Sequence, residues 1–294
     1  MTYSDLPRVP HFLVGGIAEL PDLFAALGRA RGLPREEVEG IIQLLPEPIK
    51  RSPCFLDRLT GLWRYDFGMP FVELPGDGVV LGTHMYHEVD RLYDVLFCAR
   101  RRLGEEQLSS YLNRLADPNK HEDMLTEFAP ILRLDPAVEV QYEVSGYGEG
   151  NRTVDWLIRT GAQPPLLLDV KNRRKDLLES LVRIHAGERD PAESAPMPAH
   201  DPSMLFASIE QKFNRRPHDE MIQGVWIHTS LKQEETELET VFGRLDAQRV
   251  HFAILGDWND DVCVLARDSA IKNHVLVVLR VRESRRFVFR RDSA

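Results

Sequence analysis

Two acids and a lysine stand within apolar segments at a spacing that could support chemistry. Asp155 lies inside the apolar run 154–158, and thirteen residues separate it from Asp169, which with Lys171 closes the run 166–171. Side chains alternate along a strand, so Asp169 and Lys171 would share one face, with Cα atoms about 6.6 Å apart. One face of this strand then carries chemistry and the other carries packing.

The spacing also predicts a pair of neighbouring carboxylates. If the strands around Asp155 and Asp169 pair across the turn 161–164, the two acids lie side by side. Two close carboxylates repel each other unless a cation lies between them, and oxygen ligands of this kind suit Mg²⁺ or Mn²⁺. Such an ion stabilises charge on a phosphate and lowers the pKa of water, and a nearby lysine assists. These residues therefore indicate phosphodiester hydrolysis.

The elements that must position these residues begin with a helix. Asp117 followed by a proline is typical of a helix start, and an apolar stripe follows, comprising Leu125, Phe128, Ala129 and Leu132. Glu122 and Glu127 lie beside the centre of that stripe. Next, the segment 138–143 alternates apolar and polar residues, which predicts a strand, and strands at 153–159 and 166–171 follow it.

The remaining segments extend the pattern on both sides. Helices are predicted at 36–45, 89–102, 176–185 and 204–213, and the segment 63–81 is either a hairpin or irregular. A polar loop is expected at 187–202, and later strands at 224–228, 251–255, 262–266, 275–281 and 287–289. Helices interleaved with several strands in this way predict an α/β fold with a mixed sheet.

The arrangement of Asp155 and then Asp169-Val170-Lys171 resembles the PD-(D/E)XK nuclease superfamily, although Val154 stands where the motif has proline. The resemblance covers about residues 119–228. It implies a restriction-endonuclease-like fold, in which a mixed β-sheet core is flanked by helices and the motif lies on two adjacent strands. A helix that precedes those strands usually supplies a glutamate.

Carried over by position, the resemblance implies a role for each residue. Asp155 and Asp169 would be metal ligands, with the carbonyl of Val170 as a further ligand, and Lys171 would orient or deprotonate the attacking water. Glu122 is the favoured helix acid because it borders the apolar stripe, and Glu127 is the alternative.

The charge pattern bears on the partner. The formal net charge of −9 argues against a surface that attracts nucleic acid everywhere, but it leaves room for a local basic groove. Basic residues gather at 100–102, 171–175, 215–216 and 280–291, and each group is a solvated face unless the site lies beside it. Gln211 is similar to an accessory polar residue of some superfamily relatives.

Composition sets the broad class. A chain of 294 residues with 43% hydrophobic content can bury a core, and its apolar runs are much shorter than the roughly 20 residues of a membrane helix. The start of the chain lacks the pattern of a secretory signal. Cys54, Cys98 and Cys263 form no CxxC pair, which indicates reduced thiols. We therefore expect a soluble, cytoplasmic protein without a membrane partner.

These observations predict a metal-dependent nuclease, with Mg²⁺ or Mn²⁺ as cofactor and DNA favoured over RNA as substrate. The nuclease-like domain is expected at 116–294, after a mainly helical N-terminal region at 1–115 that contributes specificity, dimerisation or a partner surface. Cleavage of duplexes by subunits with one site each would suggest a homodimer. The alternative is a catalytically silent PD-(D/E)XK-like module for binding or assembly.

Overall fold

The computed structural model describes residues 21, 24, 25, 28, 31–50, 71–74, 78–81, 83–117, 120–161, 163–172, 207–228, 242–256 and 261–283. The chain divides into two compact units. The first unit comprises Met1–Leu125 with Leu178–Pro191, and the second comprises Thr126–Leu177 with Ala192–Ala294. Along the chain, the division between the units falls within one helix, between residues 125 and 126, whereas the predicted domain boundary is between 115 and 116.

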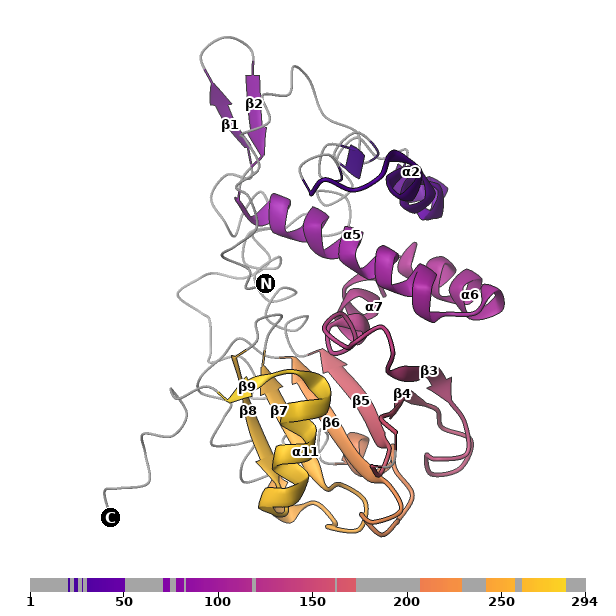
Figure 1. Ribbon diagram of the computed structural model, residues 1–294, viewed down its shortest axis with the longest axis vertical. Helices are drawn as coiled ribbons and strands as arrows, with labels where there is room; N and C mark the ends of the chain where they lie inside the picture. Colours follow the sequence, from indigo (N-terminus) through magenta and orange to yellow (C-terminus); the bar gives the residue numbers. More distant parts are fainter. Residues whose placement is uncertain are drawn as a thin grey trace, which may run out of the picture. The chain divides into compact units, whose positions relative to one another are not determined.

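Helices dominate the described part of the first unit. Its elements in chain order are α2 (Arg35–Leu44), α3 (Glu47–Lys50), β1 (Phe71–Leu74), β2 (Gly78–Leu81), α5 (Thr83–Arg102), α6 (Glu105–Leu115) and the start of α7 (His121–Phe128) (Figure 1). The helices predicted at 36–45 and 89–102 are confirmed, and the segment 63–81 contains an antiparallel hairpin of β1 and β2. Proline residues bracket α2: Pro34 caps its start and Pro46 follows its C-cap.

Helix α6 was not predicted, although the sequence carries its signal. Leu108, Tyr111, Leu112 and Leu115 recur at the spacing of one helix face, and Tyr111 and Leu115 are fully buried. The helix predicted after Asp117 is confirmed as α7, and its first turn is held by a bond from the His121 N–H to the Asp117 carbonyl.

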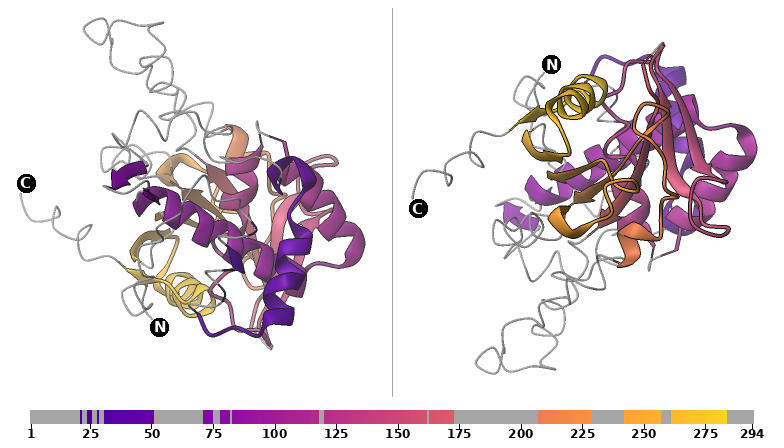
Figure 2. Two further views of the ribbon diagram at one scale, coloured as in Figure 1. Left: turned by 90° about the horizontal axis from the view of Figure 1, so that it is seen from above. Right: turned by 90° about the horizontal axis from the view of Figure 1, so that it is seen from below.

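A seven-stranded mixed sheet forms the centre of the second unit (Figures 1 and 2). Its strands are β3 (Glu139–Val144), β4 (Val154–Arg159), β5 (Leu166–Asn172), β6 (Ile222–His228), β7 (Phe252–Gly256), β8 (Asp261–Ala266) and β9 (Arg282–Glu283), and they lie in sequence order. The β3–β4, β4–β5 and β7–β8 pairs are antiparallel, whereas β5–β6, β6–β7 and β8–β9 are parallel. The predicted α/β class with a mixed sheet is therefore confirmed.

The first six strands of this sheet, β3 to β8, lie where the sequence predicts strands. The helix predicted at 176–185, the loop at 187–202 and the strand at 287–289 lie outside the described residues. Of the helix predicted at 204–213, the described part is helical at 207–210 and then turns.

The strand predicted at 275–281 is wrong, because α11 (Ser269–Leu279) occupies most of that segment. The Asp268 side chain caps this helix by accepting a hydrogen bond from the Ile271 N–H at 2.8 Å. Ile271, Val275, Val278 and Leu279 are buried at helical spacing, and the helix packs against β8. Capping and burial of one helical face outweigh the strand preference of the β-branched residues.

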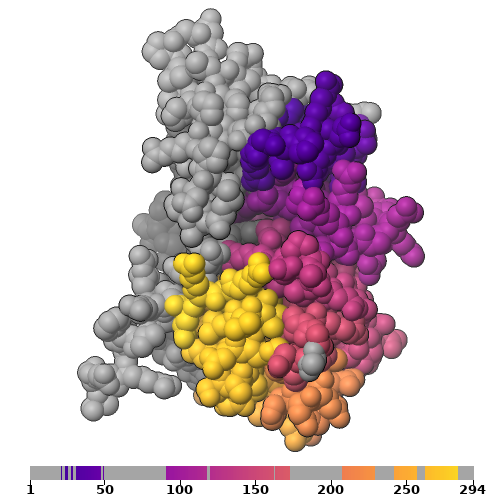
Figure 3. Space-filling view, viewed as in Figure 1, coloured from indigo at the N-terminus to yellow at the C-terminus, as the bar shows by residue number. Residues whose placement is uncertain are grey.

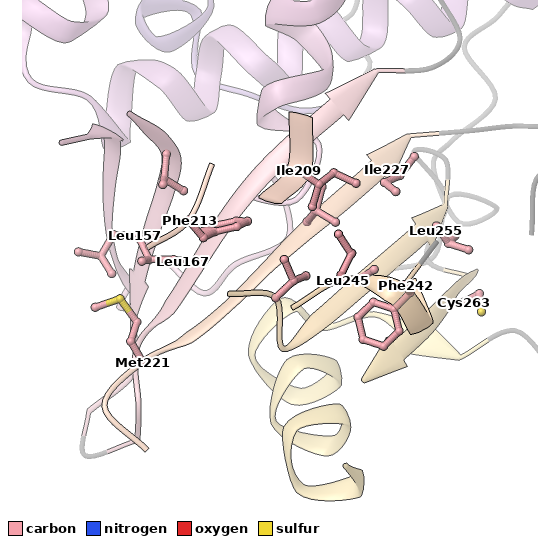
Figure 4. Packing of buried hydrophobic residues seen from close by; sticks show 14 residues of the cluster. Leu157, Leu167, Ile209, Phe213, Met221, Ile227, Phe242, Leu245, Leu255 and Cys263 are labelled. Carbon is pink, nitrogen blue, oxygen red and sulfur yellow. The ribbon is translucent and has the colours of Figure 1, made fainter. Parts of the chain in front are cut away.

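The core beside the site residues covers one face of the sheet (Figure 4). Leu157, Leu167 and Ile227 project from three successive strands into one buried cluster. Ile209 and Phe213, from the segment that precedes β6, belong to the same cluster. Since β5 alternates its faces, Asp169 shares the face of Leu167 and therefore borders this core.

The outer side of α11 forms part of the surface of the second unit (Figure 3). It carries the large exposed hydrophobic residue Val277, which is 76% exposed. Among the described residues, no helix is both long and apolar enough to cross a membrane.

Candidate active site

The site lies where β4 and β5 run side by side (Figure 1). Their antiparallel register pairs Leu157 with Leu167 and Trp156 with Leu168. One position further along this register, Asp155 comes opposite Asp169. The start of β4 and the middle of β5 therefore bring together the acids that the sequence analysis singled out.

Asp169 is the most enclosed charge of the site. Its side chain is 0% exposed, and each of its two oxygens lies beside one lysine ammonium group. The Lys171 Nζ is 2.6 Å from Oδ2, and the Lys212 Nζ is 2.8 Å from Oδ1. Both contacts are ion pairs. Among the described residues, the two ammonium groups thus supply the compensation that a buried carboxylate requires.

Asp155 is held beside β5 by the backbone. Its Oδ2 accepts a hydrogen bond from the Val170 N–H at 2.7 Å. The residue keeps some exposed surface, but its carboxyl group is enclosed by protein, and this burial raises its pKa well above 3.8. The negative charges of Asp169 and Glu127 raise that pKa further, against smaller opposing effects of Lys212 and the Val170 amide. The fold therefore disfavours the charged form of Asp155.

Lys212 is the site residue that the sequence analysis missed. Burial lowers the pKa of its ammonium group, but the carboxylates of Asp169 and Asp155 outweigh this effect, so the pKa is raised overall. Its position carried no local signal in the sequence, and the burial of its neighbours in the structure shows why it faces the acids. Lys212 follows Ile209 by three residues and precedes Phe213, and both of these are buried, whereas the neighbouring Gln211 is exposed. The accessory role of Gln211 stays a prediction. The contact with Asp169 is made by the next residue, Lys212.

Glu127 and Glu122 lie in different turns of the same helix, α7. Glu127 is in the last turn of α7 and belongs to the second unit, with Asp155 and Asp169. Its Oε2 accepts a hydrogen bond from the Tyr142 hydroxyl at 2.5 Å, and its carbonyl accepts one from the Trp156 Nε1–H at 2.7 Å.

Glu122 is in the first turn of α7 and belongs to the first unit. Its predicted role as the helix acid stays a prediction. The negative charge of Glu127 raises the pKa of Asp155. This effect favours Glu127, the alternative, over Glu122 as the acid beside the site.

The basic residues that follow the site in sequence have structural partners. Arg215 pairs with Asp246 at 2.7 Å, and the Arg216 guanidinium lies over the Tyr147 ring at 5.2 Å. Arg249 pairs with Glu149 at 3.1 Å. Residues 173–175 of the predicted basic run lie outside the described residues. Local acids therefore balance much of the positive charge in this region.

The site contains two carboxylates of the kind that a hard divalent cation such as Mg²⁺ or Mn²⁺ prefers. Asp155 and Asp169 offer carboxylate oxygens, and the buried oxygens of Asp169 have no well-directed hydrogen-bond donor among the described residues. The described residues contain no group of three or more His, Cys, Asp or Glu side chains that could hold a metal ion. An ion here would take further ligands from the Val170 carbonyl and from water, and a third carboxylate would have to approach.

Comparisons of this chain with family models, curated proteins and solved structures found no match. The functional assignment therefore rests on the residues of the site and on the order of the elements that carry them.

Proposed function

We propose that this chain is a metal-dependent nuclease that hydrolyses phosphodiester bonds, with DNA as its first expected substrate. The observation that carries the proposal is the pairing of Asp155 and Asp169 on the adjacent strands β4 and β5, with Lys171 on the same face as Asp169. A buried acid whose pKa is raised by burial and by neighbouring carboxylates, as for Asp155, is a recurrent property of catalytic sites.

The order of elements supports the resemblance to the PD-(D/E)XK superfamily and a restriction-endonuclease-like fold. Helix α7 comes first, followed by the antiparallel strands β3, β4 and β5, and then by β6 parallel to β5. The two motif strands are neighbours, as the resemblance implies. The aromatic rings of Phe128 and Trp156, 4.9 Å apart in an edge-on contact, attach the end of α7 to β4.

The residues of the chain would divide the chemistry between them. Asp155, Asp169 and the Val170 carbonyl would hold Mg²⁺ or Mn²⁺, with Glu127 or Glu122 as the further acid. The ion would supply positive charge to the phosphate and make nearby water more acidic. Lys171, fixed beside Asp169 at 2.6 Å, would orient the attacking water or take its proton. Cleavage of both strands of a duplex by such single sites would call for a homodimer.

A panel of single- and double-stranded DNA and RNA tests the proposal. The full chain is incubated with each substrate in Mg²⁺, in Mn²⁺ and in EDTA, beside a variant that carries Asp169→Ala and Lys171→Ala. We expect metal-dependent cleavage of DNA by the wild type only. Equal metal-dependent cleavage by the double variant would show that these residues take no part in the reaction, and it would contradict the proposal.

A second function is favoured by one specific observation. Both oxygens of Asp169 are already paired with ammonium groups, so the cluster is compensated without a metal, as expected of a silent binding or assembly module. Thermal unfolding with and without Mn²⁺ separates the two candidates. An ion that binds only the folded chain raises the melting temperature, whereas a silent module shows no shift.

A further inference from the structure

The proposed metal site does not account for one contact, the ion pair between Lys212 and Asp169. Lys212 comes from the segment that precedes β6, and its ammonium group reaches Oδ1 of Asp169 at 2.8 Å. It also donates to the Thr153 carbonyl at 3.3 Å. Lys171 already supplies a positive partner to the other oxygen of Asp169. Lys212 is therefore a second cation on one buried carboxylate.

The charges explain why a second cation is present. With their carboxyl groups ionised, Asp155, Asp169 and Glu127 contribute three negative charges, and Lys171 alone balances one of them. A divalent ion would balance the other two. Without that ion, Lys212 supplies part of the missing positive charge, and with the ion in place its ammonium group becomes surplus. Either cation would bind the carboxylate of Asp169.

We propose that Lys212 is the resident cation of this site, which occupies the Asp169 carboxylate until a divalent metal ion displaces its ammonium group. The inference rests on the proposed metal site and names the residue that controls its occupancy. Displacement requires no movement of the backbone. Ile209 and Phe213, 1% and 0% exposed, fix the segment in the core on either side of Lys212. The four-carbon side chain can swing its ammonium group toward solvent, since 23% of it is already exposed.

The position of Lys212 also gives the displaced ammonium group a use. It stays tethered next to the site, where a phosphate oxygen could accept its hydrogen bonds. Lys212 would then contact the substrate only in the metal-loaded state, which ties substrate binding to metal binding.

Isothermal titration of the full chain with MnCl₂ tests the proposal without any substrate. The variants are Lys212→Met and Lys212→Gln, which remove the charge and keep a side chain of similar length. The matched control is Lys272→Met, which removes the same charge from an exposed ion pair with Glu283 on α11 and β9. Circular dichroism spectra establish that each variant is folded.

We expect both Lys212 variants to bind Mn²⁺ roughly tenfold more tightly than the wild type, because the ion no longer has to break an ammonium–carboxylate contact. The Lys272 variant should bind as the wild type does. Unchanged or weaker binding in the folded Lys212 variants would overturn the proposal, and so would the lack of Mn²⁺ binding in every variant.

The outcome is independent of nuclease activity. Tighter binding in the Lys212 variants with no cleavage by the wild type would support the resident cation and overturn the nuclease. Metal-dependent cleavage with unchanged Mn²⁺ affinity would overturn the resident cation alone.

Discussion

Neutralising the two acids one at a time should change the stability of the metal-free chain in opposite directions. Asp169→Asn leaves the Lys171 and Lys212 ammonium groups side by side without their counter-charge. Breaking a buried ion pair costs about 3–5 kcal/mol. The two lysine side chains are 22% and 23% exposed and can turn toward water, so we expect a loss of about 2–3 kcal/mol in the free energy of unfolding. For a chain of this size, that corresponds to a melting temperature lower by about 3–5 °C.

Asp155→Asn should have the opposite effect. The pKa of Asp155 is raised, by burial first and then by Asp169 and Glu127, so its ionisation above the unfolded value of 3.8 costs stability. Asparagine carries no charge and can still accept the hydrogen bond from the Val170 N–H. The variant should therefore melt above the wild type at pH 7.

Thermal unfolding followed by circular dichroism at pH 7 in EDTA measures both changes, with EDTA removing any metal contribution. An Asp169→Asn chain as stable as the wild type, or an Asp155→Asn chain less stable than it, would refute this electrostatic reasoning.

Two further predictions concern the scaffold. Burial lowers the pKa of His121 from 6.5 to about 4, so stability is retained above pH 6.5 and should fall by about 3 kcal/mol as the pH drops to 4. Urea titrations across this pH range should show the loss, and a His121→Gln variant with the same slope would contradict it. Gly224→Ala would place a Cβ 2.5 Å from the Phe252 ring and carbonyl, at a cost of about 1–3 kcal/mol, whereas the Cβ of Gly243→Ala meets nothing within 4 Å. Equal melting temperatures for these two variants would show that β6 and β7 can move apart.

Much of the sheet could be predicted because local patterns and tertiary packing agree there. The alternation that predicts a strand at 138–143 corresponds to β3, whose Tyr142 is buried and packs on the Trp156 ring at 4.8 Å. The residues 166–170 of β5 are all buried, so protein covers both faces of this strand, and the sequence shows this as a continuous apolar run. In these segments, the period of the apolar residues is sufficient to identify the strand.

The sequence-based prediction failed where the strand preference of the residues and a helix cap disagree. The segment 275–281 consists largely of β-branched and apolar residues, which favour a strand, but the cap at Asp268 starts a helix before that segment is reached. The preference between Glu122 and Glu127 could not be decided either. The two glutamates border one helical stripe, and the sequence does not show which turn of α7 belongs with the strands.

Lys212 could not be assigned for a related reason. Its contact with Asp169 joins segments about forty residues apart, and no local period encodes such a contact. Only the burial of Ile209 and Phe213 shows which side of the segment faces the acids. The strand acids, in contrast, follow from the alternation of β4 and β5 once the two strands are taken to pair.

The most direct test of the central claim is cleavage of one DNA substrate by the wild type and by the Asp169→Asn variant, both folded, in Mn²⁺ and in EDTA. The account predicts cleavage by the wild type in Mn²⁺, none in EDTA, and a loss of activity in the variant of at least about a hundredfold. Cleavage that persists in the variant, or that proceeds equally in EDTA, would contradict a metal-dependent nuclease site on β4 and β5.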